Sequence, residues 1–262
     1  MHEKWESLLA HIANAADGIA LQYFRSASLE ITHKPGDGTP VTQADVGIEK
    51  AARRIVEAGH PGLGVLGEEL GAAGDSDGTR LIIDPIDGTQ NFARGIPIFA
   101  TLLAIEHNGE IVAGLVSAPA LGTRWSAVRG GGALRNGERI RVSRVSRLEE
   151  AQLFHAGVNV MGAYAGAVVA LAQRVRRSRG FGDFYQHVLV AEGAGEVAVD
   201  FDLKPWDLAP LAVIVEEAGG RYSTASGERT IYGGSFIPTN GLVHEAVIAA
   251  LNIPGTGSLA RG

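Results

Sequence analysis

The segment DPIDGT, at residues 84–89, contains the side chains of this sequence that are best suited to chemistry. Asp84 ends the apolar run LIID, which is typical of a buried strand, and Asp87 follows three positions later. Gly88 lets the backbone approach a ligand closely, and Thr89 begins a helical turn whose amides suit a phosphate. Two carboxylates this close raise each other's pKa, and a hard divalent cation removes that penalty. The segment therefore predicts a magnesium site beside a phosphate, although Asp, Pro and Gly are also common in a simple strand-exit turn.

Three other acidic positions could join this site. Glu68, in the pair Glu68–Glu69, follows the strand-like run VLG, and Asp207 precedes the apolar helical run LAPLAVIVEEAG. Asp45 lies in PVTQAD, at the start of another predicted helix. Each has a plainer explanation, because an acidic pair at a strand end is often a surface feature and Asp45 or Asp207 could cap a helix. Brought together by the fold, these carboxylates would hold metal ions that stabilise the attacking and leaving oxygens of a displacement at phosphorus.

Composition narrows the possible functions. The chain has 262 residues, a formal net charge of −6 and no cysteine. The lack of cysteine excludes disulfides, cysteine-ligated zinc and a cysteine phosphatase mechanism, and the acidic balance does not favour a nucleic-acid partner. The N-terminal stretch resembles no signal peptide, and no run approaches the roughly 20 apolar residues of a membrane span, so we expect a cytoplasmic protein that binds no membrane. Residues 62–67 (GLGVLG) fit a dinucleotide-binding pattern, but they lead into a strand and not into a helix.

The spacing of apolar residues predicts alternating helices and strands along the chain. Helices are expected at residues 5–24, 45–58, 164–174, 184–192, 208–218 and 243–251. Strands are expected at residues 65–67, 81–84, 98–106, 111–117, 124–128, 196–201 and 237–240, and a polar loop at residues 33–42. Gly219–Gly220 is a stop signal for the helix before it, and a boundary is expected near residues 143–150.

Three acidic motifs resemble those of the inositol monophosphatase superfamily: GEE at 67–69, DPIDGT at 84–89 and WD at 206–207. PVTQAD at 40–45, the Gly219–Gly220 pair and TNG at 239–241 match other family features in the expected order. The resemblance implies an α+β fold with αβαβα layers, of the inositol monophosphatase and fructose-1,6-bisphosphatase type. It also implies a magnesium-dependent phosphomonoesterase, a metal-binding subdomain at residues 1–147, a substrate-binding subdomain at residues 148–262, sensitivity to lithium, and a homodimer.

By this resemblance, two or three Mg²⁺ ions occupy the site. Glu68, Asp84 and the carbonyl of Ile86 would hold the first ion. Asp84, Asp87 and Asp207 would hold the second, and Glu68 would help to hold a weaker third.

The same resemblance assigns the remaining roles near the phosphate. Asp45 and Thr89 would form a dyad that polarises the attacking water, and together with Glu68 they are the predicted catalytic residues. The amides of Gly88 and Thr89 would grip the phosphate.

The segment GFGDFYQHVLVAEGAGEVAVD, with VSAPALGTRW and TNGLVHE, looks closer to the histidinol-phosphate phosphatases of the superfamily than to inositol enzymes. The resemblance places Asp183 and Asp200 next to the leaving group, with Asp200 replacing the usual glutamate. A carboxylate at Asp183 suits the ammonium group of histidinol, although Asp183 could merely cap a helix. His155 and His187 could approach the pocket of the second subdomain, but packing or surface roles are expected for them. We predict a histidinol-phosphate phosphatase of histidine biosynthesis. The alternatives are an inositol-1-phosphate, sugar bisphosphate or 3′-nucleotide phosphatase, or a module that binds the ester without turnover.

Overall fold

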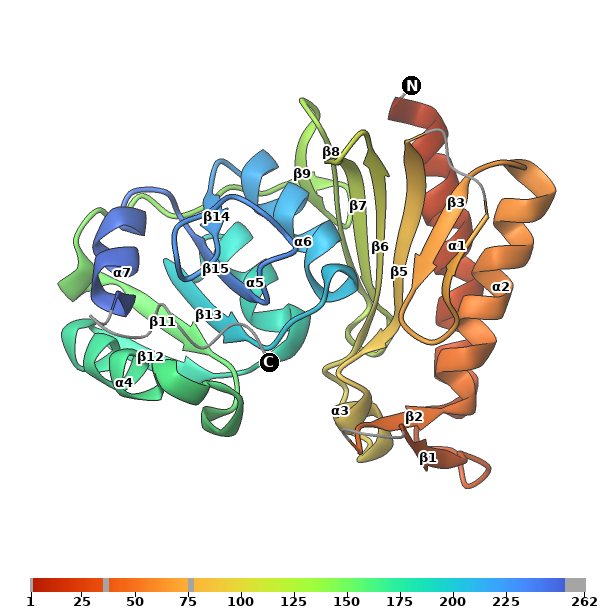
Figure 1. Ribbon diagram of the computed structural model, residues 1–262, viewed down its shortest axis with the longest axis horizontal. Helices are drawn as coiled ribbons and strands as arrows, with labels where there is room; N and C mark the ends of the chain where they lie inside the picture. Colours follow the sequence, from red (N-terminus) through yellow and green to blue (C-terminus); the bar gives the residue numbers. More distant parts are fainter. Residues whose placement is uncertain (1, 35–37, 75–77, 253–262) are drawn as a thin grey trace.

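The computed structural model describes residues 2–34, 38–74 and 78–252 and places them in five layers, alternately helical and sheet (Figure 1). The helices, in chain order, are α1 (His2–Tyr23), α2 (Gln43–Gly59), α3 (Thr89–Ala93), α4 (Ala165–Arg174), α5 (Asp183–Ala191), α6 (Pro205–Glu217) and α7 (His244–Leu251). The pair α1 and α2 covers one face of the larger sheet, α5 and α6 lie between the two sheets, and α4 and α7 cover the outer face of the smaller sheet. This order confirms the predicted αβαβα layers.

The larger sheet has eight strands in the order β10-β9-β8-β7-β6-β5-β3-β4. They are β3 (Gly64–Gly67), β4 (Gly71–Ala73), β5 (Thr79–Asp87), β6 (Ala100–His107), β7 (Glu110–Ala118), β8 (Thr123–Val128), β9 (Gly132–Arg135) and β10 (Glu138–Arg139). Neighbouring strands are antiparallel except β3 and β5, which run parallel with Gly67 paired to Ile83. Because of this register, Glu68, which follows β3, lies beside Asp84 within β5.

The smaller sheet has five strands in the order β12-β11-β13-β15-β14. They are β11 (Gln152–His155), β12 (Arg177–Gly180), β13 (Val197–Phe201), β14 (Arg221–Ser223) and β15 (Ser235–Thr239). Of these strands, β13 and β15 were predicted from the sequence, whereas β11, β12 and β14 were not. These three strands are only three or four residues long, and β12, with the sequence RSRG, has no apolar alternation.

The predicted polar loop at residues 33–42 is wrong at both of its ends. Residues Ile31–His33 (β1) and Pro40–Thr42 (β2) form an antiparallel pair. The glycines and proline between the two strands are typical of a turn. They favoured the prediction of a loop over the whole segment, because each flanking strand is only three residues long. Short 3-10 helices occur at Pro119–Leu121, Leu148–Glu150, Val158–Val160 and Gly162–Tyr164. In the described part of the chain, no helix combines the length and the apolar character that a membrane crossing requires.

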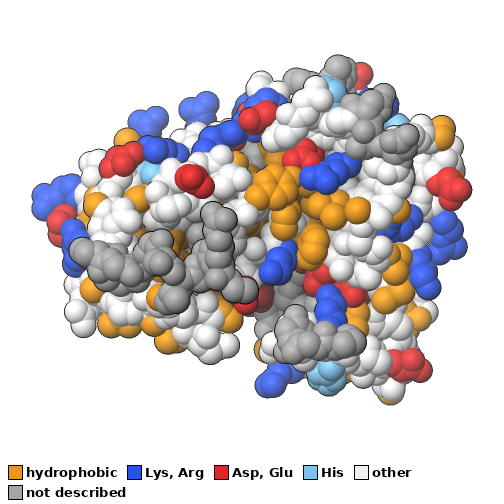
Figure 2. Space-filling model, viewed as in Figure 1, with side chains coloured by type: hydrophobic (Ala, Val, Ile, Leu, Met, Phe, Trp, Pro, Cys, Tyr) orange, Lys and Arg blue, Asp and Glu red, His pale blue; other side chains and the backbone are white. Residues whose placement is uncertain are grey.

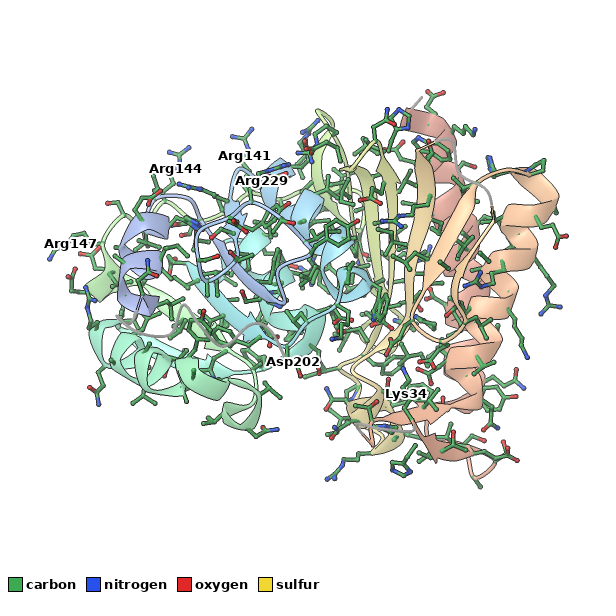
Figure 3. The ribbon with its side chains drawn as sticks, viewed as in Figure 1. Lys34, Arg141, Arg144, Arg147, Asp202 and Arg229 are labelled. Atoms are coloured by element: carbon green, nitrogen blue, oxygen red, sulfur yellow. The ribbon has the colours of Figure 1, made fainter. Side chains whose placement is uncertain are left out.

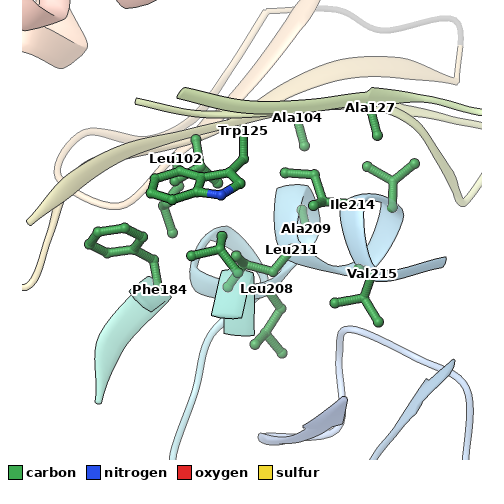
Figure 4. Close-up of a cluster of buried hydrophobic side chains, with 14 of the residues drawn as sticks. Leu102, Ala104, Trp125, Ala127, Phe184, Leu208, Ala209, Leu211, Ile214 and Val215 are labelled. Carbon is green, nitrogen blue, oxygen red and sulfur yellow. The ribbon is translucent and has the colours of Figure 1, made fainter. Parts of the chain in front are cut away.

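Helix α6 is apolar on all sides because it packs between the two sheets, against Trp125, Phe184 and small strand residues (Figure 4). It crosses β7 at Gly114, where an added Cβ atom would lie 2.7 Å from Cγ1 of Val213 and 2.8 Å from Cα of Pro210. The helix ends as predicted at the glycine pair, since Gly219 has a φ of +90°. Glycine at position 114 therefore sets how closely α6 approaches the larger sheet.

We expect Gly114→Ala to lower the free energy of unfolding by about 1–3 kcal/mol, because the methyl group forces α6 away from the sheet. Urea denaturation measures this change. The matched control is Gly166→Ala in α4, where nothing lies within 4 Å of the added Cβ. The control should be neutral or more stable by up to about 1 kcal/mol. Equal stability of the two variants would show that the approach at position 114 is not tight.

Candidate active site

A cavity of about 950 Å³ opens where the two sheets face each other across α5 and α6. Figure 2 shows a notch in the surface between the two halves, with acidic and basic side chains close to it. Apart from Asp45, the residues singled out from the sequence all line this cavity, namely Glu68, Asp84, Ile86, Asp87, Gly88, Thr89, Asp183, Asp200 and Asp207. Segments more than 130 positions apart along the chain thus contribute to one site.

Three carboxylates from different elements converge in the cavity. Glu68 follows β3, Asp84 lies in β5 and Asp207 lies in the first turn of α6, and one oxygen of each lies within 4.8 Å of the other two. Asp84 is only 2% exposed, and its Oδ1 atom has no hydrogen-bond partner among the described residues. Burial, and then the charges of Glu68, Asp87 and Asp207, raise the pKa of Asp84 well above its usual value. A buried, unpartnered oxygen among acceptor-only groups fits a hard cation.

Asp87 lies in the same cavity but outside this group of three. Strand β5 does not end at Asp84, as predicted, but continues to Asp87 through an irregularity in its pairing with β6. The Oδ2 atom of Asp87 accepts a hydrogen bond of 2.6 Å from the backbone N–H of Phe184, in the first turn of α5. Burial and the charges of Asp183 and Asp207 raise the pKa of Asp87. This side chain therefore connects the strand that contains Asp84 to a helix of the opposite half.

Asp207 is the third residue of α6 and not its N-cap. Its Oδ2 atom accepts a hydrogen bond of 2.7 Å from the N–H of Lys204, which precedes the helix. Asp207 thus stabilises the start of α6 from within the first turn and not from the N-cap position. This role leaves lone pairs of the carboxylate free to bind a metal ion. Burial raises the pKa of Asp207 to about 7, against the opposing effect of the Lys204 N–H.

Asp45 is fixed by a capping box at the start of α2. Thr42 is the N-cap, and its N–H and hydroxyl both donate to Oδ2 of Asp45, at 2.8 and 2.6 Å. Burial raises the pKa of Asp45 to about 6. The hydroxyl of Thr89 lies 3.4 Å from Oδ1 of Asp45 and 2.8 Å from the carbonyl of Ile86. A hydroxyl has only one proton to donate. In this structure Thr89 donates it to the carbonyl of Ile86, which is the nearer acceptor.

Gly88 is required by its surroundings. Its φ is +78°, and an added Cβ would lie 3.0 Å from the carbonyl oxygen of Ile98 and 3.2 Å from Oδ2 of Asp183. Only glycine combines this backbone conformation with such close neighbours. The helical turn that was predicted to follow is α3.

Asp183 and Asp200 form a second acidic pair, on the side of the cavity formed by α5 and β13. The Oδ2 atom of Asp183 accepts a hydrogen bond of 2.8 Å from the side-chain amide of Asn91. The Oδ2 atom of Asp200 accepts one of 2.6 Å from the side-chain amide of Gln186. Burial, and then the charge of Asp200, raise the pKa of Asp183 to about 6. Asp183 bonds to Asn91 and not to its own first turn, which argues against the capping explanation. Neutral amides leave the negative charge of both groups unpaired.

Two further residues of the cavity wall have notable surroundings, and the sequence did not single out Lys34 while it assigned His187 another role. Lys34, next to β1, reaches Glu68 at 2.7 Å and Glu69 at 2.8 Å, and Figure 3 shows it across the gap from Asp202. These acidic partners outweigh burial and raise the pKa of Lys34. His187 is 2% exposed and also lines the cavity, whereas we had expected a packing or surface role. The position of His187 four residues after Asp183 on one helix was the available signal.

Comparisons with known proteins identify relatives of this chain. A histidinol-phosphatase from Mycobacterium tuberculosis is 41% identical over 248 residues, which cover 92% of this chain and 95% of that protein. A histidinol-phosphatase from Streptomyces coelicolor is 39% identical and covers 93% of this chain and 96% of its own length.

A solved structure has the same fold. It is the extragenic suppressor protein suhB from Bartonella henselae, with a TM-score of 0.88, 30% identity and coverage of 96% of this chain and 99% of that one. The sequence model of the inositol monophosphatase family matches residues 2–254. The chain therefore belongs to the inositol monophosphatase family.

Proposed function

We propose that this protein is a magnesium-dependent phosphatase that hydrolyses histidinol phosphate, a small phosphate monoester of histidine biosynthesis. The observation that carries the proposal is the convergence of the Glu68, Asp84 and Asp207 carboxylates in a cavity with a second acidic pair opposite them. The two histidinol-phosphatases, at 41% and 39% identity over nearly the whole chain, support the choice of substrate.

Two or three Mg²⁺ ions are part of the proposal. Glu68, Asp84 and the carbonyl of Ile86 would hold one ion, and Asp84, Asp87 and Asp207 would hold a second, with Glu68 available to a third. The unpartnered oxygen of Asp84 and the raised pKa values of Asp84 and Asp87 support this assignment. Bound cations supply positive charge that offsets the phosphate and make water a nucleophile near neutral pH.

Asp45 and Thr89 are proposed to orient the attacking water. When the Ile86 carbonyl is engaged by another partner, the Thr89 proton becomes available to Oδ1 of Asp45, 3.4 Å away. The lone pairs of the Thr89 oxygen then accept a hydrogen bond from water, and the bond to Asp45 strengthens that acceptor. The backbone of Gly88 and Thr89 would bind the phosphate, because a side chain at position 88 would fill this space.

The leaving group is recognised by charge in this proposal. Besides the exposed Asp202, the acidic residues of the cavity lining that are not assigned to cations are Asp183 and Asp200, and both are held by neutral amides. An ammonium group placed between them would relieve the repulsion that raises the pKa of Asp183. A neutral polyol such as inositol offers no such compensation.

Three other features stay predictions of the sequence: the homodimer, the cytoplasmic location and the sensitivity to lithium. The division into subdomains 1–147 and 148–262 is also a proposal. It is supported by the position of the two sheets, since the larger one ends at Arg139 and the smaller one begins at Gln152.

A phosphate-release screen with magnesium tests the function. The panel contains histidinol phosphate, inositol 1-phosphate, fructose 1,6-bisphosphate and adenosine 3′,5′-bisphosphate, and histidinol phosphate should have the highest kcat/KM. Asp183→Asn should raise KM for histidinol phosphate about tenfold or more, because a charge-assisted bond is lost. KM for inositol 1-phosphate should stay within about threefold. Asparagine tolerates the φ of +49° at this position, so the backbone should be unchanged. Equal losses on both esters would sink the ammonium assignment.

Asp87→Asn should lower kcat by about 100-fold or more, because it weakens one metal site, which supplies several kcal/mol of transition-state stabilisation. The asparagine oxygen can still accept the N–H of Phe184, so we expect the melting temperature to change little. The control is Glu149→Gln, an exposed carboxylate outside the cavity, which should retain full activity. Full activity of purified Asp87→Asn would refute the assignment.

Removal of magnesium should make stability depend on pH. The pKa values of Asp207, at about 7, and of Asp45 and Asp183, at about 6, are higher in the folded protein than in the unfolded chain. The folded state then binds more protons, so in EDTA the melting temperature should fall as the pH rises from about 5.5 to about 8. Added magnesium should raise the melting temperature more at about pH 8 than at about pH 6, since it competes with protons. Scanning calorimetry measures both, and an equal magnesium effect at the two pH values would contradict this prediction.

A further inference from the structure

The carboxylate of Glu49 is buried in the protein, and none of the roles described above uses it. Glu49 lies in α2, four residues after Asp45 and therefore on the same face of the helix, and its side chain is fully buried. A carboxylate out of water is costly unless hydrogen bonds and a positive charge compensate it. The groups that compensate Glu49 therefore show what this side chain holds in place.

The partners of Glu49 are Arg53 and the turn between β3 and β4. Oε2 of Glu49 accepts a hydrogen bond of 2.8 Å from the backbone N–H of Glu69, and Oε1 accepts one of 3.2 Å from the N–H of Leu70. Arg53, one helical turn further along α2, donates to Oε1 from Nε at 3.0 Å and from Nη2 at 2.6 Å. The same Nη2 atom donates a bond of 2.5 Å to the carbonyl of Gly71, at the start of β4. The carboxylate and its arginine thus bind the backbone of three consecutive residues.

Gly67, the last residue of β3, leaves the space that this carboxylate occupies. An added Cβ atom at position 67 would lie 2.1 Å from Oε1 of Glu49 and 2.6 Å from Oε2. Atoms do not approach so closely, so a side chain at position 67 would push the carboxylate away from the turn. The glycine in β3 and the glutamate in α2 therefore fit together as one arrangement.

The turn held in this way carries Glu68, one of the three carboxylates that converge in the cavity. Asp84 lies within a strand and Asp207 within a helix, whereas Glu68 lies on the short turn after β3 and its side chain is 24% exposed. The N–H of Glu68 donates to the carbonyl of Ile83 at 3.2 Å, and the two N–H groups that follow donate to Glu49. Because a turn has little rigidity of its own, the position of Glu68 depends on these backbone contacts.

We propose that Glu49 is a positioning residue, which fixes the turn after β3 so that the carboxylate of Glu68 can bind a cation. This inference rests on the proposed function and extends it, because it makes the binding of one magnesium ion depend on α2. Glu49 touches neither the cation nor the substrate, and it acts through the backbone of Glu69 and Leu70. Replacing a residue that holds a metal ligand in place typically weakens metal binding by about 10–100-fold.

Magnesium titration of Glu49→Gln tests this inference. The amide has the size of the carboxylate, but its nitrogen cannot accept a hydrogen bond, so a contact with the turn or with Arg53 is lost. In calorimetry with magnesium chloride alone, we expect the dissociation constant of the ion bound by Glu68 to rise about tenfold or more. Glu68→Gln identifies that binding step, since it weakens the same ion directly. The step that Asp87→Asn weakens should stay within about threefold of wild type.

The matched control is Glu57→Gln, an exposed carboxylate about two turns further along α2, which should bind magnesium as the wild type does. In assays on histidinol phosphate, Glu49→Gln should need about tenfold more magnesium or above for its half-maximal rate, while KM at saturating magnesium stays within about threefold. A carboxylate that only stabilised the fold would lower the melting temperature. It would leave the magnesium constant of the folded molecules unchanged.

Gly67→Ala is a second test, and it leaves the charge of Glu49 in place. The methyl group displaces the carboxylate, so the same magnesium step should weaken. In Glu49→Ala the space is empty, and adding Gly67→Ala to that variant should change the constant by no more than about threefold. Additive effects of the two substitutions would overturn the inference.

A measurement on the wild type keeps the inference testable if the variants do not fold. Hydrogen exchange followed by NMR should show protected amides at Glu69 and Leu70 without magnesium, because Glu49 already holds them. Rapid exchange of both amides, or an unchanged magnesium constant in folded Glu49→Gln, would overturn the inference and leave the proposed function standing. If the wild type binds no magnesium, the proposed function fails and this inference fails with it.

Discussion

Repulsion between buried carboxylates is the constraint on which this structure depends. Asp84, Asp87 and Asp207 are brought into one cavity, out of water, and burial together with their mutual charges raises their pKa values. Such an arrangement destabilises the folded protein unless a positively charged group enters the cavity. Lys34 pairs with Glu68 and Glu69, and the charge of Lys204 acts on Asp207, but among the described residues neither lysine forms an ion pair with Asp84. The remaining deficit of charge is the physical argument for divalent cations.

The helices between the sheets keep the two halves of the site together. Helix α6 carries Asp207 in its first turn and packs tightly on β7 at Gly114, so the position of this carboxylate depends on the packing of an apolar helix. Helix α5 is bonded at its start to Asp87 and carries Asp183 in the same turn. The metal side and the leaving-group side of the cavity are therefore coupled through two buried helices and not through flexible loops.

Different chemistry on the two sides of the cavity explains how one scaffold can serve several substrates. Around Asp84 the groups are ionisable oxygens, which suit cations and a phosphate that every ester shares. Around Asp200 the neighbours are Gln186 and His187, and each has a buried atom without a partner. A change of residue on this second side alters which leaving group is stabilised without affecting the chemistry at phosphorus.

The sequence by itself determined the local features. Asp84, Asp87 and Gly88 share one short segment, and the capping residues Thr42 and Asp45 are separated by one helical turn, so patterns within a few residues predicted them. The layered fold and the helices α1, α2, α5 and α6 could also be predicted, because their apolar spacing is regular. Only the tertiary structure decided how distant groups meet. The parallel register of β3 and β5 sets Glu68 beside Asp84, a hairpin read as a loop brings Lys34 to Glu68, and α5 turns His187 towards Asp200. These contacts depend on how layers pack over long chain separations, which no local pattern encodes.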